Sequence, residues 1–178
     1  RAVRADLADP TNLEKLIPAA GPLDILVNSA AVFHKDRVGD VTAEKLLGEF
    51  WPNLFAPMLL TQEFAAQGRP GAVVNILDRR ITSHDTSCVP YLLAKKALAE
   101  FTALAALELA PGITVNAVAP GPILPPPGKD ASYIKEHGGA VPLGVTFEPK
   151  DIADAVVFLL KQDKMTGQIL FVDGGQHL

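Results

Sequence analysis

Short apolar runs alternate with longer helical patterns along this chain, and this alternation restricts its possible folds more than any other feature. Apolar runs of four to eight residues are typical of buried strands. Apolar residues spaced three and four positions apart are typical of helices that bury one face. The alternation predicts an α/β fold, with a parallel sheet covered on both faces. The predicted strands are residues 1–7, 24–27, 72–77, 113–118 and 168–172.

Helical patterns fill most of the intervals between these strands. Pro52 and Pro57 interrupt the second pattern, and we expect them to bend that helix because proline lacks an N–H group and clashes with the preceding turn. Residues 121–148 are expected to form a long loop with a short helical piece near residues 131–136, and a loop of that length is usually functional. The predicted helices are residues 11–19, 42–67, 88–109 and 149–161.

The composition excludes several classes of protein. The length suits one domain, residues 1–178, with a core of ordinary size. The net charge is -4 and no basic run occurs, so a nucleic-acid surface is not indicated. No apolar run reaches the roughly 18 residues of a membrane span. The single cysteine, Cys88, excludes an internal disulfide and fits a reducing, cytoplasmic setting.

Small or polar residues follow three of the predicted strands. Asn28-Ser29-Ala30-Ala31 follows the second strand, Asp78 the third and Pro120-Gly121 the fourth. In a parallel sheet of this kind, ligands bind beyond the carboxyl ends of the strands. The architecture therefore brings these segments to one edge, although they lie far apart in the sequence.

Tyr91 and Lys95 are four positions apart at the start of a predicted helix, so they would share one face of it. An ammonium group beside a phenol favours the phenolate, and we expect Lys95 to lower the pKa of Tyr91. Tyr91 would then be a usable proton donor or acceptor near neutral pH. A pair of this kind is more often a solvated surface feature, so its weight depends on the strand-end segments and on Asp173-Gly174-Gly175 near the C-terminus.

In this order and spacing, the set resembles the classical short-chain dehydrogenase/reductase family, over nearly the whole chain. The resemblance implies a doubly wound, Rossmann-like α/β/α fold, a nicotinamide cofactor and a small-molecule substrate. It also implies a homo-oligomer, tetramer or dimer, paired through the long helices near residues 42–66 and 88–109. Their apolar side chains permit this pairing, but core packing explains the same residues: Phe50, Leu54, Phe55, Phe101 and Leu104.

The family's Gly-rich turn, which holds the pyrophosphate of the dinucleotide, does not occur in this sequence. Members of the family carry it well before the equivalent of Asp6. The sequence therefore looks N-terminally incomplete, without the first strand, first helix and second strand. The residues that read the ribose 2′-phosphate belong to that segment, so NADP is expected by resemblance alone and NAD is not excluded.

The resemblance assigns roles to individual residues. Tyr91 would donate the proton, Lys95 would hold the nicotinamide ribose and tune Tyr91, and Asn53 would complete a proton relay. Simpler roles remain open: a solvated helix position for Asn53, a strand-capping turn for Asn28, a loop carboxylate for Asp6 and a plain turn at Pro120-Gly121. The expected cofactor-binding residues are Asp6, Leu7, Asn28, Ser29, Ala30, Tyr91, Lys95, Pro120, Gly121 and Ile123.

Asp78 departs from the family pattern, which places a serine at this position. A carboxylate donates a hydrogen bond only when it is protonated. Burial near a cofactor would raise the pKa of Asp78, whereas the adjacent Arg79 or Arg80 would stabilise the carboxylate and oppose an acid role. Pteridine reductases and dihydromonapterin reductases carry aspartate at this position, with the same tyrosine and lysine. VNAVAPGPILPPP and VPLGVTFEPKDIADAVVFLL also resemble them.

The leading hypothesis is an NADP(H)-dependent reductase of a pterin-like C=N bond, with catalytic residues Tyr91, Lys95, Asp78 and Asn53. A general carbonyl reductase or alcohol dehydrogenase of the same family is the first alternative. A non-catalytic, dinucleotide-binding regulatory protein is the second. No metal site is expected, because His34, His84 and Cys88 lack partners at ligand spacing.

Overall fold

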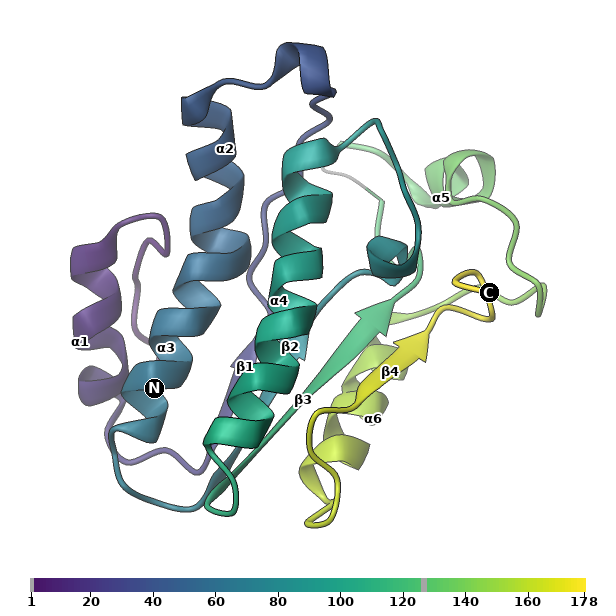
Figure 1. Ribbon diagram of the computed structural model, residues 1–178. Helices are drawn as coiled ribbons and strands as arrows, with labels where there is room; N and C mark the ends of the chain where they lie inside the picture. The colour runs from purple at the N-terminus through teal and green to yellow at the C-terminus, as the bar shows by residue number, and fades with distance from the viewer. Residues whose placement is uncertain (1, 126–127) are drawn as a thin grey trace.

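Four parallel strands form one sheet in the computed structural model, which describes residues 2–125 and 128–178 (Figure 1). Arg1, at the start of the first predicted strand, and residues 126 and 127 of the long loop lie outside the described residues. The strands are adjacent in chain order: β1 (Ile25–Asn28), β2 (Gly71–Ile76), β3 (Ile113–Pro120) and β4 (Ile169–Val172).

The central strands β2 and β3 carry the most apolar sequences because both of their faces are covered. Val73 and Val74 point to opposite faces and are both almost fully buried, as are Val115 and Val118 on β3. The registers pair Val73 with Val115 and Asn75 with Ala117. The carboxyl ends of β1, β2 and β3 therefore lie at one edge of the sheet.

Helices lie on both faces of the sheet (Figure 1). On one face α4 packs through Ala94 and Leu98 against Ala117 and Ala119 of β3. On the other face Leu159 of α6 packs against β2 and β3. The helices are α1 (Pro10–Ala20), α2 (Ala43–Phe50), α3 (Ala56–Ala65), α4 (Val89–Glu108), α5 (Ala131–His137) and α6 (Pro149–Leu160), with short helical turns η1 (Val38–Asp40) and η3 (Arg79–Thr82).

The helix predicted for residues 42–67 is divided by a π-helical turn, η2 (Trp51–Phe55), between α2 and α3. The two prolines explain the break. Pro52 and Pro57 lack the N–H groups that would bind the carbonyl groups four residues earlier, and their rings clash with the preceding turn. The interruption expected at these prolines is therefore confirmed, in the form of a π-helical turn, and Asn53 lies at the centre of η2.

One strand prediction is wrong. Residues 2–7 form no strand and lead through a turn into α1, which Asp9 caps by accepting a hydrogen bond from the backbone N–H of Thr11 (2.9 Å). A strand is stable only where a neighbour takes its backbone hydrogen bonds, and in the described sheet β1 pairs with β2 alone. Ile25 of β1 is 49% exposed, so the cover expected on both faces does not extend over this edge.

None of the described helices combines the length and the apolar character that a membrane span requires.

Candidate active site

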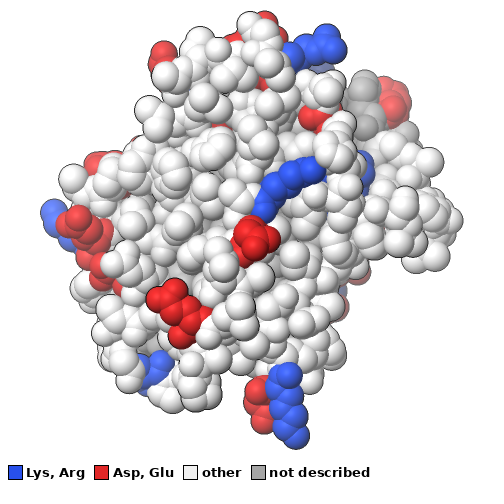
Figure 2. All heavy atoms as spheres, viewed as in Figure 1, with Lys and Arg blue, Asp and Glu red and all other residues white. Residues whose placement is uncertain are grey.

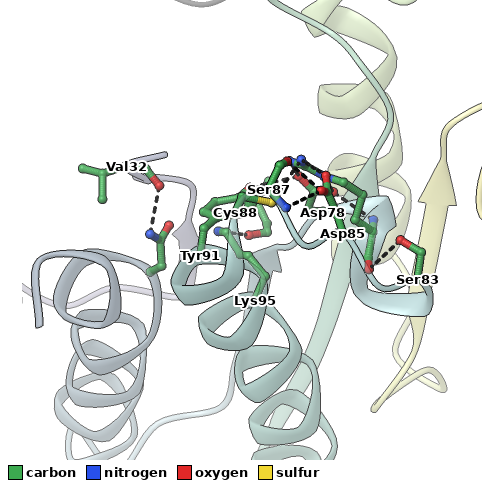
Figure 3. Close-up of polar contacts among 11 residues, drawn as sticks. Val32, Asp78, Ser83, Asp85, Ser87, Cys88, Tyr91 and Lys95 are labelled. Carbon is green, nitrogen blue, oxygen red and sulfur yellow. Dashed lines mark hydrogen bonds and ion pairs between the residues drawn. The ribbon is translucent and has the colours of Figure 1, made fainter. Parts of the chain in front are cut away.

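Tyr91 and Lys95 lie in the first two turns of α4, beside the carboxyl end of β2 (Figure 3). Pro90 suits the beginning of this helix, where an N–H group would have no helical partner. Both side chains face the sheet: Lys95 is 2% exposed, and its ammonium donates a hydrogen bond to the carbonyl oxygen of Ile76 (2.9 Å). The predicted shared face is confirmed, and the pair is buried rather than a solvated surface feature.

The hydroxyl of Tyr91 donates a hydrogen bond to Oδ2 of Asp78 (3.0 Å). Burial raises the pKa of Tyr91, and the negative charge of Asp78 raises it further. The expected net lowering of this pKa is wrong, because burial and the Asp78 carboxylate in contact with the hydroxyl outweigh any effect of the Lys95 ammonium, which lies 5.9 Å from the centre of the Tyr91 ring. Tyr91 is therefore a neutral phenol that can donate a proton.

Asp78 is held in its ionised form. Burial favours the neutral acid, but hydrogen bonds and the charge of Arg80 outweigh burial and lower the pKa of Asp78. The guanidinium of Arg80 donates to both oxygens, from Nε to Oδ1 (3.0 Å) and from Nη2 to Oδ2 (2.8 Å). The predicted rise in the Asp78 pKa is therefore wrong, and Arg80 opposes the acid role in the way its adjacent position suggested.

Burial lowers the pKa of Lys95 to about 8, although the negative charges of Asp78 and Glu49 act in the opposite direction. An ammonium group has three N–H donors, and one of them is directed to Ile76. The remaining donors are available to a ligand with hydroxyl groups, which is the role expected for Lys95.

Asn53 is fully buried, and its amide orientation follows from its partners. Nδ2 donates to the carbonyl oxygens of Val32 (2.9 Å) and Glu49 (3.0 Å) and approaches the Glu49 carboxylate (2.9 Å). Three acceptors surround the nitrogen, so the amide oxygen points away from them. This oxygen is buried and has no partner among residues 2–125 and 128–178. The alternative of a solvated helix position is therefore excluded for Asn53.

Glu49 is a site residue that the sequence reasoning missed. Its carboxylate is 2% exposed and accepts hydrogen bonds from Asn53, from the backbone N–H of His34 (2.8 Å) and from Nδ1 of His34 (2.7 Å). Burial raises the pKa of Glu49. Its spacing of four from Asn53 on a helix was a signal that could have revealed the pair.

Phe33 was also missed. Its ring packs edge-on against Tyr91, with 4.9 Å between centroids, and Arg80 lies 5.1 Å from the Phe33 ring centre. Phe33 is 41% exposed, so it forms an apolar wall beside the Tyr91 ring. It follows Asn28-Ser29-Ala30-Ala31 closely in the sequence, and its place there gave no distinctive signal.

The side chain of Asn28 faces the interior of the fold. Nδ2 donates to Oδ1 of Asn75 (2.8 Å), and Asn75 donates to the hydroxyl of Thr102 on α4 (3.0 Å). This buried chain ties β1, β2 and α4 together. Ser29 and Ala30, which follow at the end of β1, are exposed at the edge of the sheet.

Pro120 and Gly121 close β3. Gly121 donates to the carbonyl oxygen of Val172 (2.9 Å), and a Cβ at this glycine would lie 2.9 Å from Cα of Asp173. Glycine is therefore required here by backbone packing, whatever ligand the turn also contacts. Ile123 is half-buried in the loop that follows.

Asp6 and Leu7 are not joined to the other site residues by any hydrogen bond or ion pair in the described part of the chain. The carboxylate of Asp6 accepts from the backbone N–H of Ala8 (2.9 Å), and Leu7 packs against the apolar cluster of α1 and α3. Among the described residues, no three His, Cys, Asp or Glu side chains are grouped so that they could hold a metal ion.

Comparisons with known proteins show which family this chain resembles. A family model described as enoyl-(acyl carrier protein) reductase matches residues 1–177. L-xylulose reductase from Cavia porcellus is 36% identical over 97% of this chain and 75% of its own length. The uncharacterized oxidoreductase YhdF of Bacillus subtilis is 34% identical over 99% of this chain and 65% of its own length, so this chain spans only part of these relatives.

A solved structure is similar in both fold and sequence. FolM alternative dihydrofolate reductase 1 from Brucella canis, complexed with NADP, superposes with a TM-score of 0.86 at 34% identity, covering 98% of this chain and 72% of that chain. The predicted Rossmann-like α/β fold is confirmed by this likeness. The family model and these relatives together show that the chain belongs to the short-chain dehydrogenase/reductase family.

Proposed function

We propose that the protein is an NADP(H)-dependent reductase that acts on a pterin-like heterocycle at a C=N bond. The hydrogen bond between Tyr91 and Asp78 carries this proposal, because it places a proton donor and a carboxylate side by side at the sheet edge. The similarity to a structure described as an alternative dihydrofolate reductase complexed with NADP supports both the cofactor and the substrate class.

The residues fit a dinucleotide at this edge. Lys95 has N–H donors to spare for ribose hydroxyls, and Ser29 and Ala30 are small and exposed, so backbone would approach the cofactor closely. When bound, the nicotinamide supplies a hydride. The proposed binding residues remain those of the family pattern, with Asn28 contributing its backbone because its side chain is bonded to Asn75: Asp6, Leu7, Asn28, Ser29, Ala30, Tyr91, Lys95, Pro120, Gly121 and Ile123.

The proton for the substrate nitrogen comes from Tyr91. The C=N π bond breaks, the carbon gains the hydride in a new C–H bond, and the nitrogen gains the Tyr91 proton in a new N–H bond. The raised pKa keeps Tyr91 protonated until this step, and the neighbouring Lys95 ammonium stabilises the phenolate that remains. The oriented oxygen of Asn53 suits a relay that restores the Tyr91 proton.

Phe33 supports a flat substrate. Its exposed ring, fixed against Tyr91 and Arg80, offers an apolar face next to the proton donor. Aromatic faces favour offset or edge contacts with other rings. A fused heterocycle would use this wall better than an open-chain ketone would.

A carbonyl reductase is the second candidate, since L-xylulose reductase and glucose and ribitol dehydrogenase are among the relatives. NADPH or NADH oxidation by the full-length protein, with dihydrobiopterin, dihydrofolate, L-xylulose and simple ketones in parallel, separates the two. Selective turnover of the pterins is the expected result. Turnover of the sugar or ketones alone would establish the second candidate, and cofactor binding without any turnover would favour a regulatory protein.

We further propose a cytoplasmic homo-oligomer, dimer or tetramer, paired through α2, α3 and α4. The face carrying α3 and α4 has few charged side chains (Figure 2), and Leu104 and Leu107 of α4 are exposed, the latter by 79%. Leu54 is instead buried in the core, and the partly buried Phe50, Phe55 and Phe101 pack against that core. Light scattering of Leu107→Glu should show dissociation, and an unchanged mass would contradict this interface.

A further inference from the structure

The guanidinium of Arg80 is held by carboxylates on two sides, Asp78 and Asp85. On one side its guanidinium forms a two-point ion pair with Asp78, and the backbone N–H of Arg80 also donates to Oδ1 of Asp78 (2.8 Å). On the other side Nη1 donates to Oδ2 of Asp85 (3.2 Å). The side chains of Arg80 and Asp78 are only 21% and 15% exposed, so this pairing is screened little by solvent.

The second anchor is itself fixed. Asp85 accepts hydrogen bonds from the backbone N–H (2.9 Å) and hydroxyl (2.6 Å) of Ser87. Figure 3 shows Asp85 and Ser87 close to Asp78 at this end of the sheet. Asp85 therefore presets the position in which Arg80 meets Asp78.

The contacts leave Asp78 only an acceptor role. Both of its oxygens receive N–H groups from Arg80, and Oδ2 also receives the hydroxyl of Tyr91. Protonation of the Asp78 carboxylate would place a hydrogen atom on an oxygen toward which the donors of Arg80 and Tyr91 already point. A serine at this position could donate to a carbonyl oxygen, but an ionised carboxylate repels that oxygen.

We propose that Arg80 is the positioning residue that holds Asp78 as a hydrogen-bond acceptor, and that the site thereby selects substrates presenting an N–H group to Asp78. This inference rests on the proposed function and specifies its substrate class more closely. The preferred substrate carries a ring N–H or amino group next to the C=N bond that is reduced. A ketone, with only lone pairs to present, is disfavoured at the same place.

Several titratable groups surround Asp78, and their charges would influence its titration in any pH experiment. They come from η3, from the loop after it and from the beginning of α4: Arg80, Asp85, Cys88, Tyr91 and Lys95. Among these groups, Arg80 makes the two-point contact with Asp78, so its removal is the sharpest test.

The first test is direct titration of Asp78 by ¹³C NMR of its side-chain carboxyl, in the full-length protein without substrate. The Asp78→Asn spectrum identifies the signal. Asp78 should titrate below the ordinary aspartate value of about 3.9, and Arg80→Gln should raise the midpoint by roughly one pH unit or more. Arg80→Lys keeps the charge and should preserve most of the depression. Arg79→Gln, which changes the neighbouring arginine, is the control and should leave the midpoint unchanged.

The second test follows kcat/KM against pH for a dihydropterin and a ketone. Arg80→Gln should move the acid limb of the dihydropterin profile to higher pH, and should lower the preference for dihydropterin over ketone by roughly tenfold at the pH where Asp78 is neutral. If Arg80→Gln does not fold, Asp85→Asn, which weakens the second anchor, should show a smaller shift in the same direction.

An unchanged Asp78 midpoint in Arg80→Gln, or equal loss on both substrates with an unmoved acid limb, would overturn this inference. Failure of the proposed function would differ from this: the unsubstituted protein would reduce no dihydropterin at all, while the NMR midpoints could still follow Arg80.

Discussion

The hydroxyl of Tyr91 lies 3.0 Å from Oδ2 of Asp78, thirteen positions earlier in the chain, and donates a hydrogen bond to it. The contact joins the first turn of α4 to the segment that follows β2. It makes the acid–base chemistry of Tyr91 depend on a carboxylate rather than on a serine hydroxyl. Several consequences of this arrangement can be measured.

Tyr91→Phe should lower kcat by about 10²–10⁴, because the proton donor is lost. The ring and its contact with Phe33 remain, so NADPH affinity should change little. Stopped-flow turnover and fluorescence titration of NADPH measure the two effects separately. Unchanged turnover would remove Tyr91 from the mechanism, and equal losses in binding and turnover would indicate a packing role.

The activity should fall as the pH rises through about 8, because burial lowers the pKa of Lys95 to about 8 and its deprotonation removes the charge that supports Tyr91. In kcat/KM this appears as a basic limb of the free enzyme. Lys95→Arg, which stays charged, should lack that limb. A wild-type profile that stays flat to pH 9 would contradict the prediction.

Whereas activity should fall as the pH rises, the contribution of Lys95 to the free energy of unfolding should increase with pH. Between pH 8 and the ordinary lysine pKa of 10.5, the unfolded chain binds the Lys95 proton while the folded chain does not, because burial lowers the pKa of Lys95 to about 8. The free energy of unfolding therefore gains a positive slope with pH from this group. Urea unfolding at pH 7.5 to 10 of the wild type and Lys95→Met measures it; identical slopes would refute the assignment.

Glu49→Ala should reduce the free energy of unfolding by about 1.5–3 kcal/mol, because three donors from Asn53 and His34 lose a charged acceptor. Turnover should fall as well, since the Asn53 amide is no longer oriented. Glu100→Ala, an exposed position on α4, is the matched control and should stay within about 0.5 kcal/mol. Equal effects of Glu49→Ala and Glu100→Ala would show that Glu49 does not orient the Asn53 amide.

Asn75→Ala should cost about 1–3 kcal/mol, because the buried Asn28 amide loses its acceptor and the Thr102 hydroxyl loses one of its two partners while it still donates to Leu98. Asn28→Ala should be destabilising but should leave the NADPH dissociation constant of the folded protein almost unchanged. A large loss of cofactor affinity in Asn28→Ala, with normal stability, would show that this side chain contacts the cofactor directly.

Local sequence predicted most of the fold. The valine-rich runs of β2 and β3 can be buried only in a sheet covered on both faces, and Pro52 and Pro57 interrupt the helical pattern where the π-helical turn η2 forms. Residues 2–7 were predicted wrongly, because a strand depends on a neighbour that lies elsewhere in the chain.

The site was predicted in part. Tyr91 and Lys95 are four positions apart on a helix, so the sequence alone predicted that their side chains lie on the same face of α4. The pKa directions of Tyr91 and Asp78 did not, since they depend on which of two adjacent arginines turns inward. Glu49 gave only a weak signal, because a helical glutamate is usually solvated.

The most direct test of the account is the ratio of kcat/KM for dihydrobiopterin to kcat/KM for a simple ketone, measured in the full-length protein and in Asp78→Ser. The account predicts a high ratio in the wild type and a fall of roughly tenfold or more in Asp78→Ser, because serine can donate a hydrogen bond to a carbonyl oxygen and the carboxylate cannot. Equal losses on both substrates, or a wild-type protein that reduces only ketones, would contradict it.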